Sequence, residues 1–220
     1  MPHAHRRRFV LGAGVAAVTL SGVALSGMTL PRIARAASLT PTPRQTEGPF
    51  YPVAIPADAD NDLVKVAGRG AEAKGTLLRL QGRVLDVDGR PLAGSTVEIW
   101  QCDHQGRYLH PRDRGPRDED FQGYGRAIAD AEGGYSFRTI KPVSYPGRTP
   151  HIHVAVLAPN RPKLVTQMYV AGDPQNARDG LYRGLGAAGQ RAVTVELGPV
   201  SASELQGGLA GTFDIVLPLG

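Results

Sequence analysis

Cysteine is almost absent from this sequence, and a net charge is absent outside its N-terminal tail. The one cysteine among 220 residues, Cys102, excludes an internal disulfide bond, and its place after an apolar run indicates a small core residue rather than a nucleophile. Residues 1–36 contain five of the 25 basic side chains and no Asp or Glu. The remaining chain has 20 basic and 20 acidic side chains, so no nucleic-acid partner is expected.

The acid-free segment at residues 1–36 is typical of an export signal. Three arginines at positions 6–8 precede Phe9, a glycine-rich apolar stretch covers residues 9–30, and Ala34-Arg35-Ala36 offers a small-residue cleavage site. A twin-arginine signal of this kind exports folded proteins, which predicts a periplasmic or extracellular location. The stretch is long enough for a retained membrane anchor, but its weak hydrophobicity favours cleavage and no stable membrane association.

A long helical period is also lacking, and short strands with Gly and Pro turns take its place. Residues 37–75 are rich in Pro, Ala and Asp and predict an extended arm, whereas residues 76–220 predict a single β-sandwich domain in an all-β protein. Asp88-Gly89 and residues 132–134 predict hairpins, and residues 104–125 predict a long loop. Strands are expected at residues 76–84, 95–101, 126–129, 135–140, 151–157, 163–170, 192–197 and 212–217.

A His-x-His pair begins one of these strands. Because successive side chains of a strand alternate between its faces, His151 and His153 are expected on the same face as two adjacent nitrogen ligands. The prolines at positions 146 and 150 restrict the backbone, so Tyr145 and Arg148 are held near the entry to the strand. A His-x-His pair in isolation is an ordinary surface feature, so a metal site requires a second cluster upstream.

That second cluster ends at Tyr108. Together with residues 137–142 and 165–169, residues 97–108 make the sequence resemble the intradiol ring-cleaving dioxygenases, most closely the protocatechuate 3,4-dioxygenase branch. The resemblance implies O2-dependent cleavage of a catechol between its two hydroxyls to a muconate-type diacid. It also implies a non-haem Fe(III) cofactor, with the catechol and O2 as small-molecule partners. The metal ligands that it implies are Tyr108, Tyr145, His151 and His153.

The resemblance also implies roles for residues around the metal. Tyr145 would leave the metal when the catechol binds and would accept a substrate proton. Arg148 and Gln167 would stabilise negative charge as O2 attacks the ring. The residues expected to contact the substrate are Gly48, Pro49 and Tyr169.

The chemistry of this ligand set favours a hard cation. A phenol with a pKa near 10 must lose its proton to bind metal, which a strongly charged ion such as Fe(III) promotes. Zinc or copper held by three or four histidines is an alternative, because His104 and His110 flank Tyr108, although both histidines are expected to be solvated. Another alternative is a non-catalytic, transthyretin-like sandwich that binds a small ligand or partner.

One segment departs from the family pattern. Residues 146–150, between Tyr145 and His151, form a shorter connection than in the protocatechuate enzymes and lack their tryptophan. The short connection predicts a more open site that accepts substituted or bulky catechols as well as protocatechuate. Residues 46–51, which resemble the family segment that closes over the substrate, are the element best able to replace the missing wall. The oligomeric state does not follow from the sequence.

Overall fold

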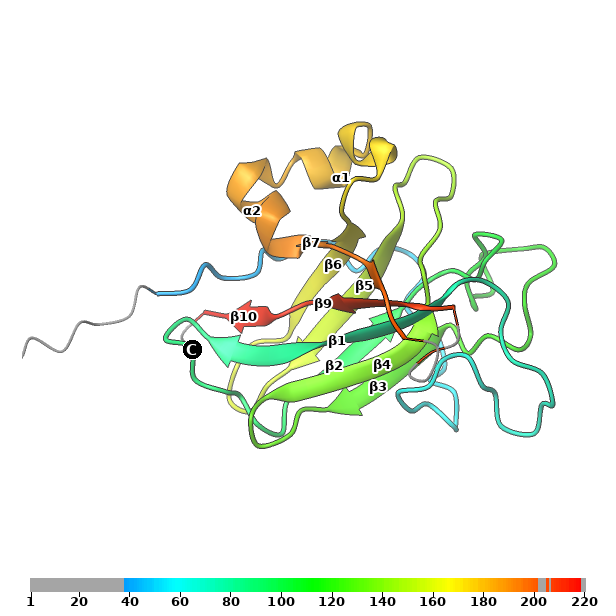
Figure 1. Ribbon diagram of the computed structural model, residues 1–220, viewed down its shortest axis with the longest axis horizontal. Coiled ribbons are helices and arrows are strands. Elements are labelled where there is room, and N and C mark those ends of the chain that lie inside the picture. Colours follow the sequence, from blue (N-terminus) through cyan, green and yellow to red (C-terminus); the bar gives the residue numbers. More distant parts are fainter. Residues whose placement is uncertain (1–37, 202–204, 206, 219–220) are drawn as a thin grey trace, which may run out of the picture. The chain divides into compact units, whose positions relative to one another are not determined.

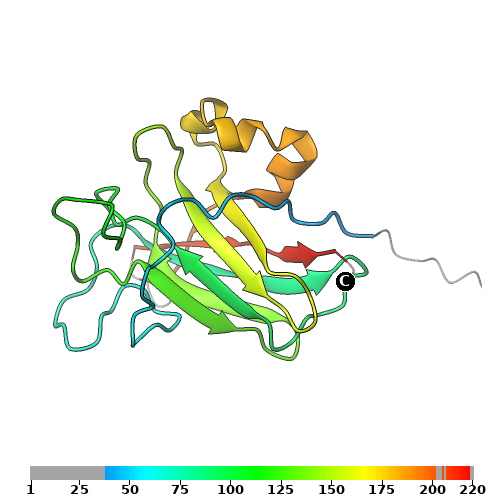
Figure 2. The same cartoon turned by 180° about the vertical axis from the view of Figure 1, so that it is seen from behind.

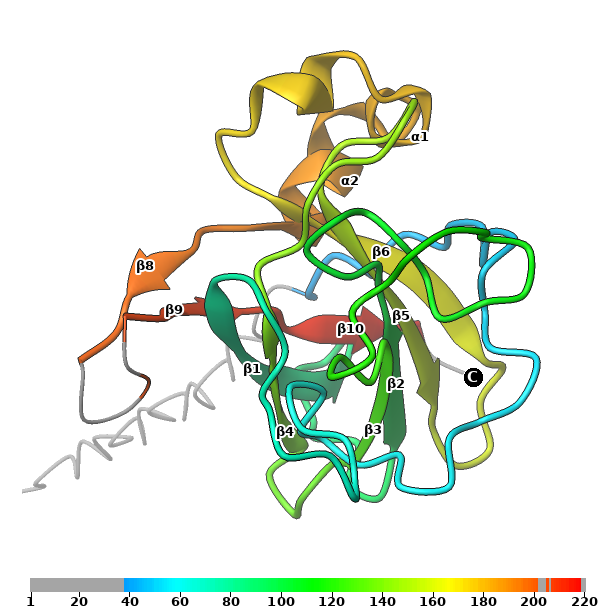
Figure 3. The same ribbon diagram turned by 90° about the vertical axis from the view of Figure 1, so that its right-hand side faces the viewer.

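Two β-sheets lie face to face and form the core of the described structure (Figures 1 and 3). The computed structural model describes residues 38–201, 205 and 207–218, so the predicted export signal lies outside the described residues. Within that part of the chain, no helix is both long enough and apolar enough to cross a membrane. The predicted all-β sandwich is confirmed.

The first sheet is built around its longest strand, β1. Strand β4 pairs antiparallel with β1, whereas β9 and β10 pair parallel with two successive stretches of it, and β8 adds to β9. The strands of this sheet are β1 (Leu77–Asp86), β4 (Gly134–Ile140), β8 (Gly198–Pro199), β9 (Leu209–Thr212) and β10 (Ile215–Leu217).

The second sheet has the strand order β3-β2-β5-β6-β7, so β5 lies at its centre. All its strand pairs are antiparallel except β6 with β7. Its strands are β2 (Thr96–Trp100), β3 (Tyr124–Ile128), β5 (His151–Leu157), β6 (Leu164–Val170) and β7 (Thr194–Val195).

Strand β5 separates two buried environments. Its residues Ile152, Val154 and Val156 belong to the apolar core between the sheets. By alternation, His151 and His153 share the opposite, outer face of the second sheet, as predicted. That face is covered by the N-terminal arm, which Figure 2 shows running across the sheet, and both histidines are only 1% exposed. A polar site can therefore be built on the outside of the sandwich and still be shielded from water.

Both predicted turns form, and Leu85 and Pro91 make an antiparallel bridge across the first, but neither turn joins two strands of one sheet as predicted. Gly89 has a φ of 78° and donates its N–H to the Asp86 carbonyl at 2.9 Å, yet the flanking strands β1 and β2 belong to different sheets. The turn at residues 132–134 likewise leads from β3 in the second sheet to β4 in the first. Turn residues determine a local reversal of the chain, but the partner of each strand depends on long-range pairing.

Helical structure follows β6, where the sequence predicts none. The strand expected at residues 192–197 is wrong in part, because α2 (Gly186–Val193) occupies its beginning, and the strand expected at 212–217 is divided between β9 and β10. Two shorter helices, η1 (Pro174–Ala177) and α1 (Gly180–Arg183), precede α2 above the sheets (Figure 1). Asp173 and Asp179 cap them by accepting backbone N–H groups. An Asp before Pro or Gly was the local signal for these helices.

Candidate functional site

Strand pairing places aromatic and polar side chains beside the two histidines. His153 lies opposite Trp100 of β2, and their rings stack with centroids 4.9 Å apart and planes 8° apart. The His151 Nδ1 atom lies 2.6 Å from the Thr149 carbonyl oxygen, which can only accept, so Nδ1 carries the proton and Nε2 is left with a lone pair. The Nε2 atoms of His151 and His153 are 3.3 Å apart.

A tight turn brings Tyr145 and Arg148 to the same place. Pro146 and Gly147 occupy its two central positions, Gly147 has a φ of 82°, and the Arg148 N–H donates to the Tyr145 carbonyl at 2.9 Å. Pro followed by a positive-φ Gly is the sequence of a type II turn. The turn leaves the Tyr145 hydroxyl 3.4 Å from His151 Nε2.

The second tyrosine reaches the site from the long loop after β2. Tyr108 is 2% exposed, and its ring stacks on Phe50 of the arm with centroids 4.6 Å apart. Its backbone N–H donates to Asp113 at 2.8 Å, while Asp103 accepts three other N–H groups of the loop, so both carboxylates cap turns of the loop. The structure therefore brings together all four predicted ligands, called the donor site below: Tyr108, Tyr145, His151 and His153.

Burial keeps the donor site uncharged in the absence of a cation. Burial, with Tyr145 nearby, raises the pKa of Tyr108, and burial also raises the pKa of Tyr145 although Arg148 opposes the rise. Burial and Arg148 lower the pKa of His151 to about 4, and burial, His151 and Arg148 together lower the pKa of His153 well below its usual value. At neutral pH both imidazoles are therefore neutral and suited to bind metal.

The donor site fits a metal ion. The Tyr108 hydroxyl is buried and has no hydrogen-bond partner among the described residues, a state that costs about 1–3 kcal/mol unless a ligand relieves it. Two nitrogen atoms bound to one first-row metal ion at about 2.1 Å and roughly 90–105° lie roughly 3.0–3.4 Å apart. The separation of the two Nε2 atoms, 3.3 Å, falls in that range.

A polar cluster lies directly beside the donor site. The Arg148 guanidinium donates through Nε to Asp179 at 2.8 Å and through Nη2 to the side-chain oxygen of Gln167. Its Nη2 atom also lies 3.5 Å from the Tyr169 hydroxyl. Gln167 and Tyr169 lie opposite His153 and His151 across the β5–β6 pair. Sequence analysis places these residues near the metal ligands but gives no indication of Asp179.

The arm closes the donor site on the solvent side. Gly48, at a φ of 73°, lies so close that a Cβ atom there would be 3.2 Å from His153 Cε1. Gln167 donates to the Thr46 carbonyl at 3.0 Å, and Tyr169 donates to Gln45 Oε1 at 2.7 Å, so the arm is tied to β6. The expectation of a more open site is therefore wrong, because the arm lies against His153 and three of the four predicted ligands are only 1–2% exposed. Pro49 itself is exposed.

Among the described residues, two further histidines do not join the donor site. His110 is buried, contrary to the expectation that it is solvated, and its ring meets the edge of Phe50 with centroids 5.7 Å apart. His104 is partly buried, 3.5 Å from Asp118. Among the described residues, no group of three or more His, Cys, Asp or Glu side chains is placed to hold a metal. The zinc or copper alternative with three or four histidines is thus unsupported.

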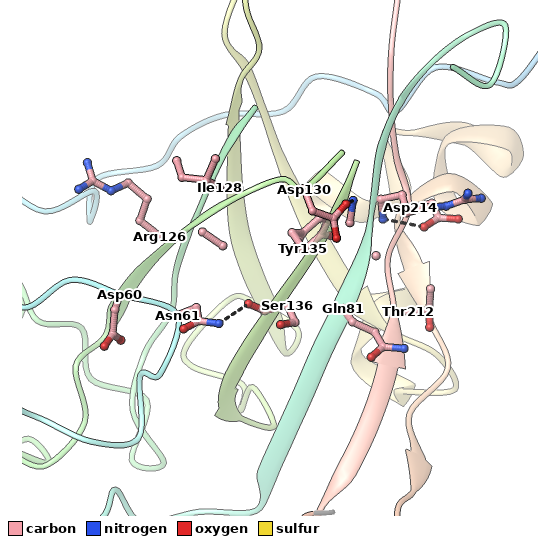
Figure 4. A pocket seen from close by; sticks show the side chains of 14 residues that line it. Asp60, Asn61, Gln81, Arg126, Ile128, Asp130, Tyr135, Ser136, Thr212 and Asp214 are labelled. Carbon is pink, nitrogen blue, oxygen red and sulfur yellow. Dashed lines mark hydrogen bonds between the residues drawn. The ribbon is translucent and has the colours of Figure 1, made fainter. Parts of the chain in front are cut away.

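A large groove lies elsewhere, at an edge of the sandwich (Figure 4). This edge groove has a volume of about 740 Å³ and shares no residue with the donor site. Figure 4 shows polar side chains of β1, β3 and β4 around it, with Asn61 hydrogen-bonded to the Ser136 carbonyl at 3.1 Å. The residues that line it include Asp60, Gln81, Arg83, Arg126, Ser136 and Asp214.

Comparison with known proteins gives consistent matches. A family model described as a dioxygenase matches residues 46–218. The protocatechuate 3,4-dioxygenase beta chain of Burkholderia cepacia is 38% identical over 184 residues, which cover 79% of this chain and 78% of that protein. Catechol 1,2-dioxygenase of Acinetobacter baylyi is 33% identical over 159 residues, which cover 64% of this chain and 50% of that protein.

A solved structure agrees with these matches. The dioxygenase domain of a dioxygenase carbohydrate-binding protein fusion from Streptomyces sp. SirexAA-E aligns with a TM-score of 0.64 and 32% identity. The alignment covers 82% of this chain and 100% of that one. The chain described here therefore spans the whole of that domain but about half the length of the matched catechol 1,2-dioxygenase.

Proposed function

The chain belongs to the family of intradiol ring-cleaving dioxygenases, and from this premise we propose that its donor site holds a non-haem Fe(III) ion. The observation that carries the proposal is the convergence of two buried phenols and two neutral imidazoles, one phenol lacking any hydrogen-bond partner in the described chain. Membership of this enzyme family, together with the donor site, argues against the non-catalytic binding sandwich considered above. The proposed ligands are Tyr108, Tyr145, His151 and His153.

The proposed cofactor explains why this ligand set contains no carboxylate. Bound Fe(III) would supply the Lewis acidity that stabilises a doubly deprotonated catechol and makes its ring reactive toward O2. Two phenolates provide negative charge for a trivalent ion, and neutral imidazoles complete the set. Both oxygen atoms of O2 enter the diacid product, so the net reaction consumes no external reductant.

The two tyrosines are suited to different tasks. Tyr108 is fully buried under Phe50, whereas Tyr145 is partly exposed on a turn whose residues Pro146 and Gly147 are exposed. Tyr145 is therefore the phenol that can move away from the site when a catechol enters. Its oxygen would then accept a proton from a substrate hydroxyl, acting as the general base.

Charge stabilisation is proposed for Arg148, supported by Gln167. Arg148 places a guanidinium next to the donor site, and Gln167 accepts one of its N–H groups. Because Gln167 also donates to the Thr46 carbonyl, its amide is held with the oxygen toward Arg148. A fixed positive charge in a water-poor site stabilises the negative charge that develops as the ring is attacked.

The arm is the proposed determinant of substrate size. Gly48 and Pro49 lie in the segment above the donor site, and the Tyr169 hydroxyl is anchored to that segment through Gln45. Because this segment lies over His153, a catechol that binds at the ligands lies beside it, so we expect these residues to contact the bound ring. A compact catechol requires the smallest shift of this segment, and we expect it to be preferred over bulky ones.

The test is reconstitution of the purified chain with iron, followed by O2 uptake with a panel of catechols. We expect about one bound iron per chain on the ligand count, a reddish colour from tyrosinate bound to Fe(III), and a muconate-type diacid that contains both atoms of labelled O2. Binding of zinc or copper in preference to iron, or a product cleaved beside the hydroxyls rather than between them, would overturn the proposal.

Export through the twin-arginine pathway is a separate proposal, supported by residues 1–36 alone. Because this pathway carries folded proteins, the metal could be acquired before export. Replacing Arg7 and Arg8 with lysine should retain the protein in the cytoplasm, as measured by cell fractionation. Equal export of the altered chain would contradict the assignment.

A further inference from the structure

Asp179 has a fully buried carboxylate that no role discussed so far explains. Its side chain is 0% exposed, and it accepts hydrogen bonds from four donors. One oxygen, Oδ1, accepts from the backbone N–H groups of Leu181 and Tyr182 at 2.9 and 3.1 Å, which caps α1. The other oxygen, Oδ2, accepts from Arg148 Nε at 2.8 Å and from the Thr149 N–H at 3.1 Å.

The two oxygens therefore connect separate parts of the fold. The Oδ1 bonds hold the carboxylate rigidly at the start of a helix, and the Oδ2 bonds hold the segment that leads into β5. A cap alone would use a single oxygen and would not require complete burial of a charge. The second oxygen thus marks a function beyond helix capping.

Because the guanidinium is planar, the bond to Asp179 also fixes the end of the Arg148 side chain that lies beside the donor site. The five N–H donors of the guanidinium lie in one plane, so fixing Nε fixes the direction in which both Nη groups point. With Nε held by Asp179, Nη2 reaches Gln167 and lies 3.5 Å from the Tyr169 hydroxyl, beside the donor site. The Arg148 side chain is itself 16% exposed, so without Asp179 it is free to turn further toward solvent.

We propose that Asp179 is a positioning residue for ring cleavage, which holds the Arg148 guanidinium at the donor site through the Nε bond. The inference rests on the proposed function of Arg148 in stabilising charge. Burial opposes ionisation of both groups, but their mutual hydrogen bond prevails, lowering the pKa of Asp179 and raising the pKa of Arg148. The pair is therefore ionised throughout the pH range in which the enzyme is expected to work.

A neighbouring cap provides a matched control. Asp173 caps η1 through the Gln175 N–H at 2.9 Å, and its contact with the turn is the Thr149 hydroxyl at 3.4 Å, so it does not touch Arg148. Asp173→Asn and Asp179→Asn remove the same charge from equivalent cap positions. A difference between these two variants reports what Asp179 does beyond capping a helix, and a double-mutant cycle with Arg148 assigns the part that acts through the guanidinium.

The experiment is a double-mutant cycle on the iron-loaded enzyme. Asp179→Asn should lower kcat roughly 10- to 100-fold, the usual effect of losing a partner that orients an active-site group, with iron content and the visible tyrosinate band retained. In an Arg148→Gln background the same substitution should cause no further fall in kcat. Asp179→Glu, which restores the charge, should recover part of the lost rate, and Asp173→Asn should keep kcat within about threefold of the unaltered enzyme.

A second measurement needs neither iron nor turnover. In the metal-free protein, the Nε–H proton of Arg148 should give a resolved NMR signal that exchanges slowly with water, because its acceptor is buried. The signal should be lost in Asp179→Asn and kept in Asp173→Asn. Melting temperatures of all variants show whether each is folded.

Three results would overturn the proposal: additive losses of kcat in the double variant, an equal loss in Asp173→Asn, or an unchanged Arg148 signal in Asp179→Asn. Failure of the proposed function itself gives a different pattern. In that case no variant, nor the unaltered enzyme, would cleave catechols, while the NMR signal would still report whether Asp179 holds Arg148.

Discussion

The donor site and the edge groove differ in what their polar groups have for partners. The edge groove has a volume of about 740 Å³, and its charged side chains are exposed, so water can satisfy them (Figure 4). At the donor site His151, His153 and Tyr108 are 1–2% exposed, and the Tyr108 hydroxyl has no partner in the described chain. Buried polar atoms without hydrogen-bond partners indicate a functional site more strongly than the volume of a groove does.

The largest expected effect is the loss of a histidine ligand. His151→Ala and His153→Ala should each abolish the visible colour and reduce both iron content and kcat. Losing a residue that only contacts a metal ligand lowers metal affinity or activity roughly 10- to 100-fold, and we expect the loss of a ligand itself to exceed that range. The physical reason is that each substitution removes a neutral nitrogen ligand, and water cannot easily take its place because the site is buried. Elemental analysis and O2 uptake measure the two losses, and retained colour and activity in both variants would show that the ligands are assigned wrongly.

The next largest effect is expected for the two tyrosines, whose substitutions should change different properties of the enzyme. Tyr145→Phe should keep most of the iron but lower kcat about 10²- to 10⁴-fold, because the proton acceptor for the substrate is lost. Tyr108→Phe removes the more deeply buried phenolate and should weaken iron binding itself, with a shifted or bleached visible band. Iron titrations followed by spectroscopy distinguish these outcomes. Equal loss of iron in both variants would contradict the division of tasks between Tyr108 and Tyr145.

Sequence reasoning predicted the parts of the site that depend on local rules. The alternation of side chains along a strand placed His151 and His153 on one face, and the Tyr-Pro-Gly-Arg turn brought Tyr145 and Arg148 together. The location of Tyr108 depended on resemblance, because no local rule relates it to β5. The contact of Asp179 with Arg148 spans 31 residues and was not predicted.

The errors have the same origin. Residues 46–51 were named as the element that could replace the missing wall, but the sequence did not show that the arm closes the site, because the closure depends on bonds between residues more than 120 positions apart, such as Tyr169 with Gln45. The strands on either side of the two predicted hairpins belong to different sheets, because the choice of sheet is decided by strand pairing and not by turn residues. Local patterns therefore predicted the neighbourhood of the His-x-His pair, the family resemblance added Tyr108, and long-range packing decided how enclosed the site is.

A smaller effect should appear in the pH dependence of the metal-free protein. Because the pKa of His151 is lowered from 6.5 to about 4 in the folded state, the unfolded chain binds more protons between these values. The free energy of unfolding should therefore fall as the pH falls from about 6.5 toward 4. The melting temperature of the metal-free protein should decrease over this range, and less steeply in a His151→Gln, His153→Gln variant. An identical slope in that variant would show that burial of the histidines does not cause the decrease.

The smallest effect is expected at the edge groove, where it tests whether the groove serves catalysis at all. Arg83 and Arg126 line it, and their exposed side chains lie outside the donor site. If the groove captured substrate, these two cations would attract an anionic catechol such as protocatechuate and raise its kcat/KM relative to that of neutral catechol. We expect no such contribution, because the groove shares no residue with the donor site.

The Arg83→Ala, Arg126→Ala double variant should keep kcat/KM for both substrates within about twofold, the range of ordinary surface substitutions. Its ratio of protocatechuate to catechol activity should also respond to salt as in the unaltered enzyme. A tenfold loss of kcat/KM for protocatechuate alone would reverse the comparison. The edge groove would then select the substrate that the donor site cleaves.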